Sequence, residues 1–458
     1  MIDYNGKRNI FSKPKKQNNP VRIFFGLLVI LGLLFVLRGL NTGALHSPFM
    51  PTPSPTRTFS SYAQEGDTQF AAGNLQESIN AYQNAVRIDP NNPDLIAQLV
   101  RIQVYSSSQQ TTDATKRARL EEAIQTATAA IELFPGNSAL HAVHAFALDW
   151  YATPSIAGDD WQSYLIKAEQ EAVQGIQLDS TNTLALVYYA EILVDQQKLN
   201  QAEQYISQAM QKDTGLMDVF RVNGYVQESL GHYNEAIGNY EKALAIYPNL
   251  NFLYISIGAN YRKLADDSYY GSAQWTDYYN KALEQFQNAV NINDQQKVKD
   301  PIPLISIANT YTQMGEFFSA ANNMVKAVEF SPSDPIVYGQ LGIVYYKARN
   351  YEGSILPLKC LIRGCTAAES CMVRNRGAEC DPAEVPDIPI QALPLSQSTV
   401  AYYFTYGSVL AGLHQPSNGY CEEAMQIFDE IRRGFGSDTT IMSIVDEGES
   451  ICKYYGYN

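Results

Sequence analysis

Residues 217–250 decide the fold, and they read MDVFRVNGYVQESLGHYNEAIGNYEKALAIYPNL. A glycine, Gly224, precedes a turn at residues 231–233, and the residues that follow at helical spacing are Ala236, Tyr240, Ala243 and Pro248. Residues three or four apart share one face of a helix, so the two alanines and Tyr240 line one side of a second helix. Two short helices cannot bury their own apolar faces. A unit of this kind that recurs therefore predicts a stacked array.

This order of aromatic, leucine-glycine, tyrosine, alanine, aromatic and proline, over about 34 residues, resembles the tetratricopeptide repeat (TPR). Further copies in register are marked by Gly66 and Pro90, by Tyr189 and Ala202, by Leu304 and Pro332, and by Tyr338 and Gly342. The resemblance implies an all-α fold, a right-handed superhelical solenoid of about nine TPR helix pairs with a C-terminal capping helix, preceded by one transmembrane helix. It also implies a bacterial protein of the cell envelope.

Three copies are longer than the family period by roughly ten residues, namely residues 93–137, 138–182 and 251–296. We expect their extra polar residues to form loops between the two helices of each pair, at Ser106–Thr115, Thr153–Asp160 and Asp266–Ala273. A last pair, near 399–413 and 421–433, matches poorly, as terminal repeats do. Residues 438–454 are predicted to be the capping helix.

These patterns divide the chain into six parts. We expect a cytoplasmic basic tail over 1–20, a transmembrane helix or signal anchor over 21–40, a Pro-rich linker over 41–58, a TPR solenoid of about eight repeats over 59–368, a Cys/Pro-rich irregular insertion over 369–396, and the last degenerate repeat with its cap over 397–458.

The N-terminal apolar segment has two interpretations. Val21 to Leu40 is apolar apart from Arg22 and Arg38, a length that suits one membrane-spanning helix. Lysines and arginines precede it, so the positive-inside rule places the N-terminus in the cytoplasm and the repeats outside, as a single-pass cell-membrane protein. Alternatively it is a cleaved secretory signal, because Thr42-Gly43-Ala44 resembles a cleavage site. Both interpretations export the repeats.

Charge argues against one class of partner. Residues 1–40 hold seven Lys/Arg and one Asp, and the rest of the chain holds 26 basic against 46 acidic residues. Binding to nucleic acid or to anionic lipid requires a basic face, so no nucleic-acid partner is expected. The excess of acidic residues also keeps a large exported surface soluble.

All six cysteines lie in the last quarter of the chain: Cys360, Cys365, Cys371, Cys380, Cys421 and Cys452. An even number in an exported domain indicates disulfides, although six cysteines allow 15 connectivities. We favour a pair between Cys421 and Cys452 that ties the last repeat to its cap, with the other four cysteines crosslinking the irregular loop from 360 to 381. No Cys-x-x-Cys knuckle or neighbouring histidine supports a metal site.

The sequence offers little catalytic chemistry. His141 and His144 share a helix face, but in the repeat register they occupy positions that face the partner helix, so we interpret them as core residues. No Walker-type phosphate loop and no Gly-x-Ser-x-Gly elbow is present. We therefore expect no enzyme, no cofactor and no metal.

The resemblance implies a partner site, because the first helices of TPR pairs line a concave groove that holds peptides or protein segments. By register its lining is Phe146, Trp150, Leu184, Val187, Arg221, Tyr225, Phe252, Ile255, Ile302, Ile305, Ile336, Ile343 and Tyr346. An apolar lining predicts a ligand with hydrophobic anchors, unless neighbouring repeats bury these residues or the register is shifted. The Pro-rich segment 385–395 is a possible internal ligand that fills part of the groove.

Together these observations predict a membrane-anchored, extracytoplasmic TPR scaffold or adaptor that binds a protein or peptide in its groove and reaches the membrane through its N-terminal helix. The alternative is a structural subunit that self-associates or packs into a larger membrane complex or filament.

Overall fold

The computed structural model describes residues 19–42, 57–212, 215–381, 383 and 386–457. It forms two units, Met1–Arg57 and Thr58–Asn458. The predicted cytoplasmic tail, apart from its last two residues, and most of the predicted linker lie outside the described residues. In the first unit, α1 (Pro20–Asn41) is long and apolar enough to cross a membrane. Membrane anchors and signal sequences share this length and composition.

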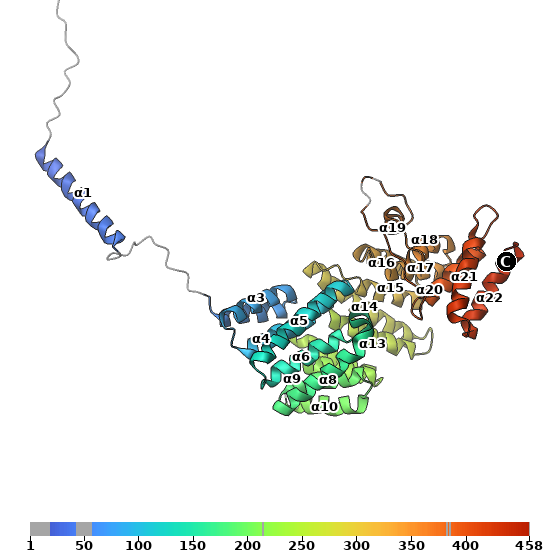
Figure 1. The fold of residues 1–458 in the computed structure, drawn as a ribbon, viewed down its shortest axis with the longest axis horizontal. Helices are drawn as coiled ribbons and strands as arrows, with labels where there is room; N and C mark the ends of the chain where they lie inside the picture. Colours follow the sequence, from blue (N-terminus) through green and yellow to red (C-terminus); the bar gives the residue numbers. More distant parts are fainter. Residues whose placement is uncertain (1–18, 43–56, 213–214, 382, 384–385, 458) are drawn as a thin grey trace, which may run out of the picture. The chain divides into compact units, whose positions relative to one another are not determined.

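The second unit is an all-α array, in which nine successive helix pairs are packed side by side (Figure 1). Among its described residues there is no β-strand, only an isolated bridge between Cys365 and Ile390. The pairs are α2 (Phe59–Ala71) with α3 (Leu75–Ile88), α4 (Pro93–Ser106) with α5 (Asp113–Leu133), α6 (Ser138–Tyr151) with α8 (Trp161–Leu178), α9 (Thr183–Asp195) with α10 (Leu199–Lys212), α11 (Met217–Ser229) with α12 (Tyr233–Ile246), α13 (Asn251–Asp266) with α14 (Ala273–Gln296), α15 (Ile302–Met314) with α16 (Phe317–Phe330), α17 (Pro335–Lys347) with α18 (Tyr351–Ile362), and α20 (Val400–Gly412) with α21 (Tyr420–Phe435). A final helix, α22 (Thr439–Tyr454), packs on α20 and α21.

The pair α11/α12 shows why the small residues of the repeat are needed. Ala236 and Ala243 are fully buried, and Tyr240 is only 3% exposed. A Cβ atom at Gly224 would lie 2.8 Å from the Tyr240 ring, closer than side chains approach one another. Glycine at this position therefore lets α11 and α12 come together around the tyrosine.

Two of the three longer copies place their extra residues differently from the prediction, whereas residues 267–272 form the predicted loop between α13 and α14. We expected loops, but residues 107–109 form the 3-10 turn η1, and residues 154–160 form α7 (Pro154–Ala157) and the turn η2 (Gly158–Asp160). The second helices also absorb part of the length, since α5 has 21 residues and α14 has 24, compared with 14 in α12. Helix extension satisfies the backbone polar groups that a loop would leave to water.

The first six pairs do not form an open spiral. Phe70 of α2 packs edge-on against Tyr247, which follows α12, with 4.8 Å between the ring centroids. The Gln109 side chain donates to the Gly73 carbonyl and to the side chain of Gln296 at the end of α14, at 3.0 and 2.9 Å. The start of the array is thus in contact with its sixth pair. One buried apolar cluster runs through this closed part, from Phe70 to Ile257.

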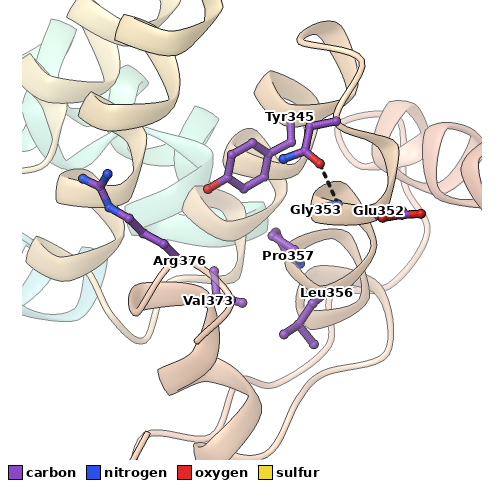
Figure 2. Close-up of a pocket in the computed structure, with 9 residues that line it drawn as sticks. Tyr345, Glu352, Gly353, Leu356, Pro357, Val373 and Arg376 are labelled. Carbon is purple, nitrogen blue, oxygen red and sulfur yellow. Dashed lines mark hydrogen bonds between the residues drawn. The ribbon is translucent and has the colours of Figure 1, made fainter. Parts of the chain in front are cut away.

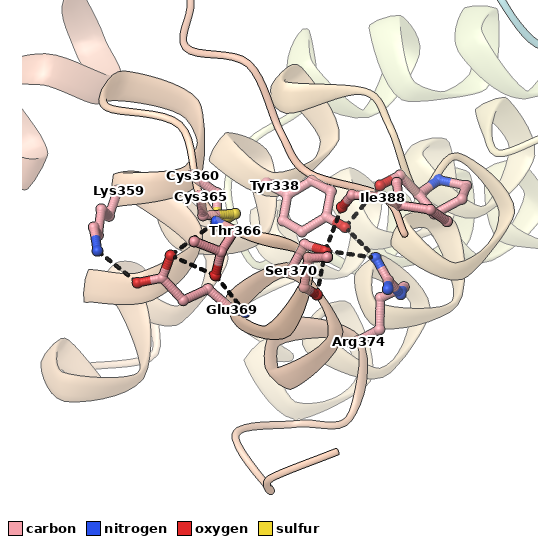
Figure 3. Close-up of a disulfide and its surroundings, with 11 residues drawn as sticks. Tyr338, Lys359, Cys360, Cys365, Thr366, Glu369, Ser370, Arg374 and Ile388 are labelled. Atoms are coloured by element: carbon pink, nitrogen blue, oxygen red, sulfur yellow. Dashed lines mark hydrogen bonds and ion pairs between the residues drawn. A yellow bond between two sulfur atoms is a disulfide. The ribbon is translucent and has the colours of Figure 1, made fainter. Parts of the chain in front are cut away.

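The irregular insertion follows α18 and carries one short helix, α19 (Ala367–Arg374). Thr366 and Glu369 form a capping box at its start, and Lys359 of α18 pairs with Glu369 at 2.6 Å (Figure 3). Arg374 donates to the Tyr338 hydroxyl at 2.9 Å, and Ser370 donates to the Ile388 carbonyl at 2.6 Å. Side chains of α17 and α18 therefore fix α19 on the array.

Three cysteine pairs lie at disulfide distance. Cys360 pairs with Cys365, Cys371 with Cys380, and Cys421 with Cys452. The first connects α18, which contains Cys360, to the turn that follows it, and the second lies within the irregular insertion. The third connects α21 to α22, which is the connection favoured in the sequence analysis.

The Pro-rich segment does not occupy the groove that we hypothesised for it. Leu393 donates its backbone N–H to the Leu361 carbonyl of α18 at 2.8 Å, and Ile390 bonds with Cys365. A Cβ atom at Gly434 of α21 would lie 3.0 Å from the Leu395 side chain. The segment from residue 386 to 395 thus runs along the second helices of the last pairs, whereas Val385 lies outside the described residues.

Candidate functional site

The N-terminal half of the predicted groove lining is filled by the protein itself. Phe146 and Val187 are completely buried, and Arg221 is 5% exposed. Phe252 stacks on Tyr105 of α4, with 5.7 Å between the ring centroids. Trp150, Leu184 and Tyr225 are partly buried against the apolar cluster of the closed part, and Ile255 is partly buried against a smaller cluster around Phe286. In the closed part, Phe146, Val187 and Arg221 are buried, and the other members of this half are partly buried.

A network of charged residues occupies the centre of the closed part. Arg101 of α4 forms a buried ion pair with Asp218 of α11, and its Nε atom lies 3.0 Å from Asp218 Oδ1. Arg221 binds Glu191 of α9 through two nitrogens, at 2.6 and 2.5 Å. Burial would raise the pKa of Asp218, but the charge and hydrogen bonds of Arg101 outweigh it and hold that pKa below its ordinary value. These charges are paired, and they join three first helices.

Buried tyrosines complete this network. The Tyr105 and Tyr188 hydroxyls both donate to Asp218, at 2.5 and 2.7 Å. Tyr105 in turn accepts a hydrogen bond from Arg221 Nε at 3.0 Å. Because Asp218 of α11 accepts hydrogen bonds from Arg101 and Tyr105 of α4 and from Tyr188 of α9, the network ties these three helices together and leaves no free carboxylate at its centre.

Two further carboxylates stand at the edge of the network. Asp149 of α6 is 3% exposed, and neither of its carboxylate oxygens has a hydrogen-bond donor. Burial raises the pKa of Asp149, and contact with Asp195 and Glu191 raises it further. Burial also raises the pKa of Asp195 to about 6, although Tyr225 donates to it at 2.5 Å. When two carboxyl groups lie in contact, sharing one proton is more favourable than both groups carrying a negative charge.

The two histidines are held within the core, as interpreted from the register. His141 Nδ1 lies 2.6 Å from Glu171 Oε2, and its Nε2 lies 3.1 Å from the Pro135 carbonyl. His144 approaches Glu171 at 3.4 Å. Among the described residues no three His, Cys, Asp or Glu side chains are placed to hold a metal ion.

The C-terminal half of the array has an accessible face, which we call the C-terminal face. It is formed by α17, α20 and α22, with α17 packed on α20 and α20 on α22. One hollow of about 380 Å³ is lined by Tyr346, Phe404, Thr405, Ser408, Ile444, Glu447, Gly448 and Ile451. A second, of about 220 Å³, shares Tyr346 and Ser408 with it and reaches Leu413. Tyr346 is 39% exposed and Ile451 is 36% exposed.

Five predicted lining residues belong to this half. Tyr346 lines both hollows, whereas Ile336 and Ile343 are partly buried beneath the face. Ile302 is 40% exposed, and Ile305 packs partly on the neighbouring core. The sequence reasoning missed the residues of α20 and α22. The repeat register could have identified Ser408 as a lining residue, since it is the ninth residue of α20 just as Ile343, a predicted lining residue, is the ninth of α17.

Comparison with known protein families identifies the repeats. Residues 66–99 match the family described as TPR repeat, and residues 224–250 match the family described as tetratricopeptide repeat. The chain contains TPR repeats. The second match covers the end of α11 and all of α12, the pair whose sequence decides the fold. No curated protein sequence matches the chain.

Solved structures resemble the fold at low sequence identity. The IFIT1 monomeric mutant with Gppp-AAAA is 14% identical, with a TM-score of 0.50, and the match covers 88% of this chain and 82% of that one. A related IFIT1 mutant with m7Gppp-AAAA is 13% identical with a TM-score of 0.52, covering 86% and 80%. Cut9 with Hcn1, from the APC/C hetero-tetramer, is 14% identical with a TM-score of 0.49, covering 68% of this chain and 52% of that one, about half its length. At these identities the IFIT1 likeness shows an all-α TPR-like array.

Proposed function

We propose that this protein is a scaffold or adaptor whose C-terminal face binds a segment of another protein of the cell envelope. The observation that carries the proposal is the contrast between the two halves of the array. The interior of the first six pairs is filled by a buried charged network, whereas the C-terminal face keeps two hollows and exposed apolar side chains. Contiguous exposed apolar surface on a soluble domain is typical of an interaction site.

The composition of the face defines the chemistry of the partner. Of the three helices of this face, α20 contains no charged residue and α17 contains only Lys347, at its last position, whereas α22 carries Asp446, Glu447, Glu449 and Lys453. Ser408 and Thr405 add hydroxyl groups, and Glu447 is the one carboxylate that lines the hollows of this face. A segment with apolar anchors and one cation opposite Glu447 fits this surface better than an acidic peptide.

Membrane attachment and export are part of the proposal. α1 would anchor the chain, with the N-terminus in the cytoplasm and the array outside. Cysteine pairs at disulfide distance support an oxidising compartment. A TPR array binds through its surface, and we propose no catalytic step.

The test is crosslinking on intact cells that express the full-length protein, followed by affinity capture and mass spectrometry. The Ser408→Lys variant places a long cation between the two hollows, and Ser163→Lys on the exposed surface of α8 is the matched control. We expect the same envelope proteins in fixed ratio with wild type and control, and their loss with Ser408→Lys. Equal recovery from all three would contradict binding at this face.

Self-association is the alternative outcome of that experiment. Ladders that contain only this protein, with a mass that grows with concentration, would replace the adaptor by a self-assembling structural subunit.

A further inference from the structure

A third cavity lies outside the C-terminal face, and we call it the Tyr345 pocket. It has a volume of about 160 Å³ and is bounded by the end of α17, the start of α18 and the loop after α19 (Figure 2). Tyr345 lines this pocket, whereas its neighbour Tyr346 lines the hollows of the C-terminal face. Consecutive residues of a helix point in different directions, so the two sites lie on different sides of α17.

The lining of the pocket combines apolar side chains with the polar Asn350 and Glu352, and its floor has one unusual backbone feature. Pro357 and Val373 are buried, and Leu356 lies beside them. Pro357 stands inside α18 and has no N–H, so the Gly353 carbonyl lacks the donor that an α-helix normally supplies four residues later. Gly353 and Pro357 both line the pocket. The floor therefore combines apolar walls with a backbone acceptor whose helical partner is missing.

The outer wall is a short loop closed by a cysteine pair. Arg376 and Gly377 line the pocket, and both have left-handed backbone conformations, with φ of 56° and 87°. Gly377 donates its N–H to the Met372 carbonyl at 2.8 Å. Cys371 and Cys380, at disulfide distance, enclose this loop. Arg376 is thus presented at the rim by a constrained segment, near the Tyr345 ring (Figure 2).

The volume decides the size of the occupant. Pockets for whole metabolites or drug-sized ligands measure about 300–1,000 Å³, whereas an apolar cavity of about 150 Å³ holds one benzene ring. An aromatic ring also suits the rim, because a guanidinium stacks on an aromatic face. An acceptor without a donor favours a ring that carries an O–H or N–H, since an unpaired polar group in an apolar contact is costly.

We propose that the Tyr345 pocket binds one tyrosine or tryptophan side chain of a protein partner, whose O–H or N–H donates to the Gly353 carbonyl. Such side chains are the commonest anchors of protein interfaces. The site is separate from the C-terminal face, so this inference does not depend on the proposed function. It adds a second contact point on the other side of α17.

The test uses three small probes with the full-length protein in detergent: N-acetyltryptophanamide, N-acetyltyrosinamide and N-acetylphenylalaninamide, titrated by ligand-observed NMR. The tryptophan and tyrosine probes should bind roughly fivefold more tightly than the phenylalanine probe, the effect of one hydrogen bond. Equal affinities for all three probes, or binding of none, would overturn the proposal.

Three variants localise the binding. Leu356→Trp fills the pocket and should abolish binding, whereas the matched Ile451→Trp change, in the first hollow of the C-terminal face, should leave it intact. Pro357→Ala restores an N–H for the Gly353 carbonyl, so it should keep binding but lose the preference for tryptophan and tyrosine. Changing Cys371 and Cys380 together to serine should weaken all three probes. Binding that survives Leu356→Trp, or a preference that survives Pro357→Ala, would place the ring elsewhere.

Discussion

Arg101 and Asp218 lie 117 residues apart in the sequence and form a buried ion pair in the middle of the array. A repeat array normally holds together through neighbouring repeats alone. This pair instead connects the second helix pair to the fifth, and it does so beside Tyr105, Tyr188 and Arg221. It identifies the first six pairs as one cooperative unit.

The Arg101→Met variant should lower the free energy of unfolding by about 3–5 kcal/mol, because it leaves the Asp218 carboxylate buried without its charge partner. Urea unfolding followed by circular dichroism measures the effect. Arg87→Met is the control, since Arg87 is exposed and donates to Asn84, and the change should alter stability by less than about 0.5 kcal/mol. A loss of similar size in both variants would show that the Arg101–Asp218 ion pair makes no special contribution to the stability of the array.

Stability should fall as pH rises from about 4 to about 6. The pKa of Asp195 is raised to about 6 and that of Asp149 is raised as well, so the folded state holds protons that the unfolded state has lost. Asp149→Asn removes the like-charge contact, and its stability should vary less over this range and exceed that of wild type at pH 7. Denaturant unfolding at several pH values measures this. An unchanged pH profile would mean that the two carboxyls do not share a proton.

The opposite pH dependence belongs to Asp218, whose pKa is lowered in the folded state. Its contribution is present above the ordinary pKa of an aspartate, about 3.9, and is lost as pH falls below it. Acid unfolding of wild type should therefore begin below pH 4, and Asp218→Asn should flatten the acid limb.

Alanine substitutions at two glycines of one helix pair should change the stability of the protein in opposite directions. Gly224→Ala places a Cβ atom 2.8 Å from the Tyr240 ring and should cost about 1–3 kcal/mol through overpacking. Gly238→Ala on α12 meets no atom within 4 Å and should stabilise the protein by about 0.5–1 kcal/mol, because alanine favours a helix. Thermal unfolding of the two variants measures both changes in stability. Equal and small effects would show that α11 and α12 do not pack this closely.

Loss of the link between α21 and α22 should loosen the C-terminal end. Cys421 and Cys452 are 31 residues apart, and a crosslink over such a loop contributes about 3–4 kcal/mol. Changing both to serine should open the turn near Gly436 to protease, as limited proteolysis with mass spectrometry would detect. The Cys371 and Cys380 double variant serves as the control, since it should leave this turn protected.

The topology of α1 can be tested by mass and by protease accessibility. A retained anchor predicts a full-length protein in the membrane fraction whose array is digested by protease added outside intact cells. A mature protein that begins near Ala44 would instead identify a cleaved signal.

The sequence predicts the helix pairs because their spacing and small residues are local. Gly224, Ala236 and Ala243 report contacts within one pair, and the same register continues through most of the array. The contacts that close the first six pairs could not be predicted from this local pattern. The partners Arg101 and Asp218 occupy different repeats, and only the curvature of the whole array brings them together. The right-handed twist stays a prediction.

The candidate site was predictable in part for the same reason. Tyr346 lies in a repeat with a clear register, and it lines the accessible hollows. Phe404 and Ile451 belong to the degenerate last pair and the cap, where no repeat signal marks the lining positions. Phe146 and Val187 have the right register, but contacts from distant repeats cover them.

The contact of Gln109 with Gly73 and Gln296 also sets how the molecule would carry mechanical force. A chain held at its N-terminus and pulled at its far end stretches an open array like a spring, one repeat after another. Here tension that enters at α2 can pass directly to the end of α14 through the closure, bypassing the pairs between them. Those pairs would bear no load until the closure breaks, so extension should begin in the three C-terminal pairs, where partners are proposed to bind.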